Sequence, residues 1–196
     1  MKPFTFLSLL GVAAAQGVRI DWDCQATPPI GGPQQLSLNN TVQGDAPSAV
    51  KPGDVFNIML ASNALTIPAT AAGFPINTLR DIKLSVPVPP GTSHIASTLA
   101  GGSKPATVAE AGGVVTISVA DAVAGGAAFN FPLIHLNLAA TGAVGNVIES
   151  RLAGRGYASP GLRFVANIKV GIINLDVPTA CFPAGSPALT RTTIEA

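Results

Sequence analysis

The stretch Leu162–Val170, with the sequence LRFVANIKV, is the clearest indication of the fold. Every second residue is apolar, beginning with Leu162 and Phe164, and Arg163 stands between these two. Because successive side chains of a strand point to opposite faces of its sheet, this pattern predicts a half-buried strand. The same alternation recurs in four further segments, at 54–62, 81–88, 115–119 and 129–138.

Glycine and proline turns separate these segments, as at Lys51–Asp54, Pro89–Gly91 and Ser159–Gly161. Glycine accepts a positive φ, and proline presets the first central position of a turn. No long amphipathic helix lies between the strands, and Ala69–Ala72 is the best candidate for a helical turn. Many strands without intervening helices predict an all-β fold, an antiparallel sandwich of about 8 or 9 strands.

The composition of the 196 residues fits one globular domain. Only 11% of the residues are charged and 47% are apolar, which excludes a chain disordered by high charge. The formal net charge is +1 and Lys and Arg form no cluster, so we expect no nucleic-acid partner.

Residues 1–15 have the features of a signal peptide. Lys2 precedes the apolar run Pro3–Val12, and Ala13 and Ala15 supply the small residues before a cleavage site. The alternative is a hydrophobic first strand. No later segment is long and apolar enough for a membrane span, which needs about 20 residues. We therefore expect one exported β-sandwich domain over residues 16–196, secreted or held in the cell envelope.

Cys24 and Cys181 are the two cysteines, one near each end of the exported part. An even number of cysteines in an exported chain favours a disulfide, which would pin both ends to one sandwich. The alternative is a pair of buried free thiols. We expect no metal site, because neither histidine has ligand spacing to a cysteine.

Five segments resemble small secreted cell-envelope domains of actinobacteria. They are Cys24–Leu38, Ala49–Phe56, Leu84–Pro89, Ser97–Ser103 and, most closely, Leu175–Pro183, with the sequence LDVPTACFP. This resemblance implies an immunoglobulin-like β-sandwich that is exported. Some members carry a cyclase or dehydratase label, but the resemblance transfers no catalytic motif onto these residues.

Catalytic and cofactor motifs are missing from the sequence. It contains no nucleophile elbow, phosphate-binding loop or dinucleotide fingerprint, so we expect no catalytic residues and no cofactor. Ser93 and His94 are adjacent, but neighbours on a strand point to opposite faces. His94 and His135 are interpreted as surface residues of strands.

Arg151, Arg155 and Arg163 are the basic grouping of the second half, and Tyr157 lies among them. Arginine pairs with carboxylates and aromatic rings stack on sugars, so these four residues form a candidate ligand patch. The alternative is a solvated loop with ordinary salt bridges.

Three functions are consistent with these observations. The first is a non-catalytic surface domain, structural or adhesive, whose partner is a cell-wall or surface glycan. The second is a carrier or sensor of an apolar small molecule between the sheets, suggested by the mean hydropathy of +0.45. The third is an enzyme of unknown reaction, and the missing motifs make it the weakest of the three.

Overall fold

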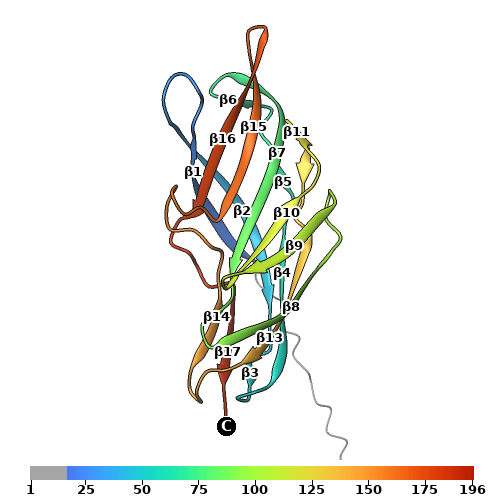
Figure 1. The fold of residues 1–196 in the computed structure, drawn as a ribbon, viewed down its shortest axis with the longest axis vertical. Coiled ribbons are helices and arrows are strands. Elements are labelled where there is room, and N and C mark those ends of the chain that lie inside the picture. The colour runs from blue at the N-terminus through green and yellow to red at the C-terminus, as the bar shows by residue number, and fades with distance from the viewer. Residues whose placement is uncertain (1–16) are drawn as a thin grey trace, which may run out of the picture.

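The computed structural model describes residues 17–196, and all regular secondary structure in that range is β-strand (Figure 1). The predicted signal peptide lies outside the described residues. The strands are β1 (Val18–Ala26), β2 (Gln34–Asp45), β3 (Ala49–Val50), β4 (Val55–Ser62), β5 (Leu65–Thr66), β6 (Thr70–Ala71), β7 (Phe74–Pro87), β8 (Thr92–Ala100), β9 (Ala106–Ala111), β10 (Val114–Val119), β11 (Val123–Ala124), β12 (Ala128–Phe129), β13 (Leu133–Ala140), β14 (Val147–Ser150), β15 (Leu162–Val170), β16 (Ile173–Pro183) and β17 (Thr190–Ile194).

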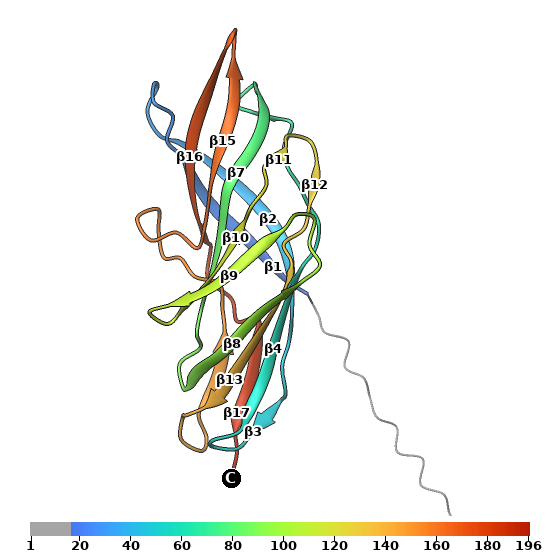
Figure 2. The same ribbon diagram turned by 45° about the vertical axis from the view of Figure 1, so that its right-hand side comes forward.

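One large antiparallel sheet dominates the molecule. Its strand order is β8-β13-β4-β2-β1-β16-β15-β7-β10-β9, and the short strands β6 and β11 also pair with β7. The edge strands β8 and β9 follow one another in the chain and come close together, so the sheet curls until it is nearly closed (Figure 2). The inner faces of its two halves pack against each other around a common core.

Two small sheets complete the fold. Strand β12 pairs with β5, and β17 joins β14 to β3, with the β17–β3 pair parallel. The β14-β17-β3 sheet lies at the end of the elongated molecule that carries the C-terminus, opposite the tip of the β15–β16 hairpin (Figure 1).

The alternating segments supply the core as predicted, with one informative departure. In β15, Leu162, Phe164 and Ala166 are buried, whereas Ile168 and Val170 are only half-buried. The outer half of the β15–β16 hairpin extends beyond the rest of the sheet (Figures 1 and 2). The apolar alternation of β15 therefore continues to Val170, although its buried positions end at Ala166.

The all-β antiparallel fold is confirmed, but the number of strands differs from the prediction. Residues 17–196 contain 17 strands instead of about 8 or 9, and five of these have only two residues. Such short pairs leave no alternation to detect in a sequence. The large sheet is also continuous, and the immunoglobulin-like sandwich stays a prediction.

The predicted disulfide joins Cys24 of β1 to Cys181 of β16. The two residues are directly opposite in the strand pairing, their Cα atoms are 4.0 Å apart, and both are fully buried. The bond thus ties the first strand to the penultimate one across a sequence separation of 157 residues.

The predicted helical turn at Ala69–Ala72 is wrong. Thr70 and Ala71 form β6, which pairs with Phe74 and Pro75 of β7. Ala72 and Gly73 make the turn between the two strands, with φ of 49° and 82°. The glycine permits this left-handed turn, and it directs the alanine-rich segment back along β7.

Candidate functional site

A groove of about 330 Å³ crosses the outer face of the large sheet. It lies over the neighbouring strands β1, β16, β15 and β7, which run side by side in Figure 1. Polar and apolar side chains both line it: Gln25, Thr27, Asp81, Lys83, Pro160, Arg163, Phe164, Val165, Pro178, Thr179 and Ala180. We refer to these eleven residues as the sheet groove.

A row of directly opposed residues forms the middle of the sheet groove. Gln25 is opposite Ala180, Ala180 is opposite Arg163, and Arg163 is opposite Lys83. Adjacent strands are about 4.8 Å apart, so the row spans roughly 14 Å. Ala180 is the only short side chain among the four, which leaves a hollow between the longer ones.

A β-bulge shapes the wall of the groove on β7. Against β15, Lys83 is opposite Arg163 and Arg80 is opposite Val165, so β7 carries one extra residue. Asp81 at this bulge has a φ of +54°, which is unusual for a residue with a side chain. The bulge leaves Arg80 and Asp81 both exposed, although they are consecutive. The alternation from Ile82 onward would point Arg80 inward, so the bulge brings this guanidinium to the outer face beside Asp81 and the groove.

A hydrogen-bonded network continues from this wall along the hairpin. Arg80 donates to Asp81 at 2.6 Å and to Asp176 at 2.7 Å, and Asn167 donates to Asp176 at 2.9 Å. The hydrogen bonds from Asn167 and Arg80 lower the pKa of the Asp176 carboxyl, and Asp176 raises the pKa of Arg80. Asn77 extends the network by donating to Asn167 at 2.9 Å. The charged side chains of this wall are therefore already paired with one another.

The two cations inside the groove are not paired in this way. Within residues 17–196, neither Arg163 nor Lys83 lies within salt-bridge distance of a carboxylate. Arg163 is exposed and Lys83 is half-buried. Both are therefore free to donate to an acidic or hydroxyl-rich ligand.

Arg151, from the predicted ligand patch, lies in a different network. Its guanidinium donates to Glu149 at 2.5 Å and to the Ser186 carbonyl. Glu149 also pairs with Arg191 of β17 at 2.5 Å, and these hydrogen bonds lower the pKa of the Glu149 carboxyl, that from Arg151 most strongly. This cluster holds β14 to β17 and to the loop before β17.

The other patch residues lie in the β14–β15 loop and on β15. The Tyr157 ring packs edge-on against Phe182 with ring centroids 5.2 Å apart, and Arg155 is an exposed residue of the same loop. Arg163 is the predicted residue that lines the sheet groove. The structure thus divides the four residues between a strand network, a loop and the groove.

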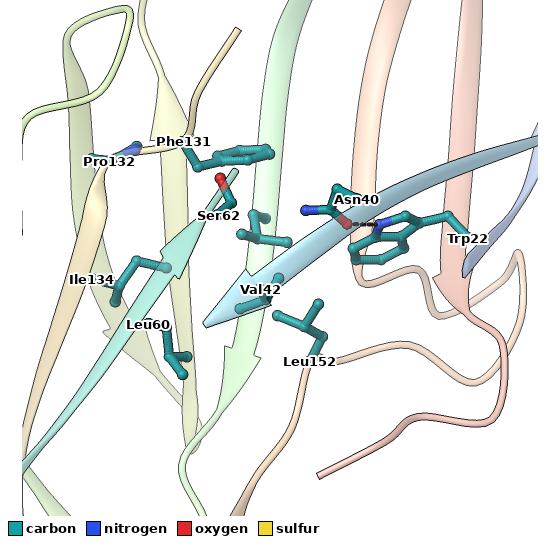
Figure 3. A pocket seen from close by; sticks show the side chains of 10 residues that line it. Trp22, Asn40, Val42, Leu60, Ser62, Phe131, Pro132, Ile134 and Leu152 are labelled. Atoms are coloured by element: carbon teal, nitrogen blue, oxygen red, sulfur yellow. Dashed lines mark hydrogen bonds between the residues drawn. The ribbon is translucent and has the colours of Figure 1, made fainter. Parts of the chain in front are cut away.

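A pocket between the two halves of the sheet is small. It measures about 20 Å³, enough for roughly one water molecule. Figure 3 shows Trp22 at its side, donating its indole N–H to the Asn40 side-chain oxygen at 2.9 Å. Trp22, Leu60, Leu84, Phe131 and Ile134 are among the lining residues. An apolar ligand needs about 300 Å³ or more, and this cavity does not offer that room.

The two histidines lie on neighbouring strands. On β8, the His94 Nε2 is 2.7 Å from the Ser97 hydroxyl, and both residues are half-buried. A catalytic pair of this kind also needs a group that orients the imidazole, and the hydrogen bonds of residues 17–196 give His94 no carboxylate partner. His135 of β13 alternates with buried leucine and isoleucine, which agrees with its predicted place on the polar face.

Metal-ligating groups do not gather in the part of the chain that the structure describes. Among residues 17–196 there is no cluster of three or more His, Cys, Asp or Glu side chains suited to a metal ion. Nor do these residues contain a helix with the length and apolar character for crossing a membrane.

Sequence reasoning missed Gln25, Lys83 and Asp81 as neighbours of Arg163. The strand pairing that joins them links segments more than fifty residues apart, which no local pattern reveals. The bulge did leave a signal, because buried Leu79 and Ile82 are three positions apart where regular alternation requires two or four.

Comparisons with known proteins give a distant structural neighbour. No family model and no curated protein matches the chain. A similar solved structure is that of a Corynebacterium diphtheriae protein described as membrane anchored, with a TM-score of 0.58 and 15% identity. The match covers 92% of this chain and 38% of that chain, so this chain spans well under half of its neighbour's length. At this identity the likeness is one of fold.

Proposed function

We propose that the chain is an exported, non-catalytic surface domain that binds a cell-wall or surface glycan along the sheet groove. The observation that carries the proposal is the pair of unpaired cations, Arg163 and Lys83, in a shallow groove. Gln25 adds both a donor and an acceptor, and Asp81 adds acceptor oxygens. Such a mixture suits the hydroxyl groups of a sugar chain, and the free cations favour a glycan that carries carboxylates.

Other features support a surface role. A disulfide at the core is typical of proteins that leave the reducing cytoplasm. The neighbour described as membrane anchored is compatible with a place in the cell envelope, as is the resemblance to secreted actinobacterial domains with an immunoglobulin-like fold. The His94–Ser97 pair has no orienting group and the pocket beside Trp22 is small, so the enzyme and carrier alternatives have less support.

Co-sedimentation with isolated cell walls and with a soluble acidic polysaccharide tests the proposal. The double variant Arg163→Ala/Lys83→Ala should lower the affinity by about a hundredfold or more, because it removes two charge-assisted contacts and each contributes about 1.5–3 kcal/mol. Arg19→Ala is the matched control. It removes an exposed arginine of β1 about 20 Å along the strand from Gln25.

The glycan proposal predicts that Arg19→Ala binds like the wild-type protein. An equal loss in both variants would reveal unspecific charge attraction instead. If the wild-type protein did not co-sediment with either material at any salt concentration, the proposal would be rejected.

A further inference from the structure

The end of the molecule opposite the C-terminus exposes several large apolar side chains. Ile172 is 98% exposed at the tip of the β15–β16 hairpin, and Ile173 beside it is 51% exposed. Ile30, in the β1–β2 loop, is 79% exposed, and Phe74, at the start of β7, is 41% exposed. The hairpin tip, the β1–β2 loop and the β6–β7 turn all lie toward this end in both views (Figures 1 and 2). We call these four residues the apolar tip.

The conformation of the β15–β16 turn does not require an isoleucine at position 172. Val170 is paired with Ile173, so Gly171 and Ile172 are the two turn residues, and Gly171 has the positive φ that such a turn requires. Turn positions of this kind favour small or polar residues. A fully exposed isoleucine there gains nothing from the core, which extends along β15 only as far as Ile168.

The apolar tip is also free of carboxylates. The segments 24–44, 55–79 and 170–175, which contain its residues, include no Asp, Glu, Lys or Arg. The nearest charge in the hairpin is Lys169, an exposed cation two residues before the turn. Transfer of this end into an apolar environment would therefore bury no ionised group, while a cation would stay at the boundary.

The shape and composition of the apolar tip indicate whether its partner is a protein or a lipid surface. Protein interfaces are typically flat, with tyrosine, tryptophan and arginine at their centres. The apolar tip is instead built on projecting turns, and three of its four members are isoleucines. Aliphatic side chains on projecting turns, with a lysine behind them, suit the boundary between headgroups and acyl chains.

We propose that the apolar tip docks on a lipid surface. Ile172 and Ile173 enter the outer acyl region, Ile30 and Phe74 contact the interface beside them, and Lys169 lies at headgroup level near anionic lipid. The sheet groove lies lower on the same hairpin strands, on their outer face, and keeps its access to solvent. This inference does not depend on the proposed glycan binding.

Vesicle co-sedimentation with the purified full chain tests the docking. The probes are vesicles of phosphatidylcholine alone and of phosphatidylcholine mixed with phosphatidylglycerol. Ile172→Asn should reduce the partition coefficient by about tenfold, because it removes a large aliphatic side chain from the interface. Val144→Asn is the matched control, since Val144 is 56% exposed in the β13–β14 turn near the opposite end and should bind like the wild type.

A fluorescent variant gives a second readout that does not depend on loss of binding. Ile172→Trp should blue-shift its emission on addition of vesicles, whereas the buried Trp22 contributes a constant background. Both substitutions leave the melting temperature unchanged if Ile172 makes no core contact.

Three results would overturn the proposal. The wild-type protein could fail to bind both vesicle types. Ile172→Asn and Val144→Asn could lose binding equally, or the Ile172→Trp emission could stay unshifted. If sedimentation velocity instead showed a dimer that Ile172→Asn abolishes, without vesicle binding, the apolar tip would be a self-association site and the lipid proposal would fail.

Discussion

Removal of the Cys24–Cys181 disulfide should destabilise the fold mainly through the unfolded state. The bond closes a loop of 157 residues, for which the chain-entropy relation gives roughly 5 kcal/mol at 25 °C. In a chain of this size that corresponds to a fall in melting temperature of about 10–20 °C. The double variant Cys24→Ala/Cys181→Ala and the wild type reduced with dithiothreitol are compared by urea unfolding, with the oxidised wild type as reference.

The two forms without the disulfide separate the contribution of chain entropy from that of side-chain packing. Both cysteines are fully buried, so the alanine variant also loses sulfur contacts, whereas the reduced wild type keeps them. The unfolded-state explanation predicts slower folding, a nearly unchanged unfolding rate and a larger m-value, because the unbridged unfolded chain is more expanded. Faster unfolding with an unchanged m-value would refute this reasoning and would place the stabilisation in the native state.

Two further predictions concern the backbone and the paired carboxylates. At the β7 bulge, the Asp81→Gly variant should be more stable than the Asp81→Ala variant by about 1 kcal/mol in urea unfolding. Both variants lose the carboxylate, and only alanine is strained at a φ of +54°. The opposite order of stability would mean that the bulge relaxes to a regular strand. The pKa of the carboxyl groups of Asp176 and Glu149 is lowered in the folded protein, so their contribution to stability is fully present above the unfolded-state pKa near 4 and is lost as the pH falls through the lower folded-state pKa. Urea midpoints measured across this range should fall with the pH, and Glu149→Gln should flatten the slope; a slope unchanged in Glu149→Gln would show that this carboxylate does not contribute.

Strand alternation predicted the fold class because burial of one sheet face requires an apolar side chain at every second position of a strand. The residues Leu84, Val86, Ile117 and Leu136 are all buried where a period of two places them. The cysteine count also predicted the disulfide, since two cysteines of an exported chain have only each other to pair with. These inferences need no knowledge of which strands are neighbours.

The candidate site could not be predicted in the same way, because the strand pairing creates it. One row across the sheet contains Gln25 of β1, Arg163 of β15 and Lys83 of β7, with Ala180 of β16 between Gln25 and Arg163. The strand order β1-β16-β15-β7 that forms this row has no local signature in the sequence. The basic grouping of the sequence was therefore only partly informative. It included Arg163, but it also included Arg151, whose guanidinium is used by Glu149 and Ser186.

The sheet groove and the apolar tip have a common structural origin in the β15–β16 hairpin. Its lower half faces the core with Phe164 and Ala166, so only its outer face is free for a ligand, and that face carries Arg163. Beyond Ile168 the hairpin has no core to cover, so the constraint that fixes apolar residues inward is absent there. Ile172 nevertheless remains apolar at the tip. Because neither the turn nor the packing requires that residue, its chemistry is best explained by a contact that forms outside the folded chain.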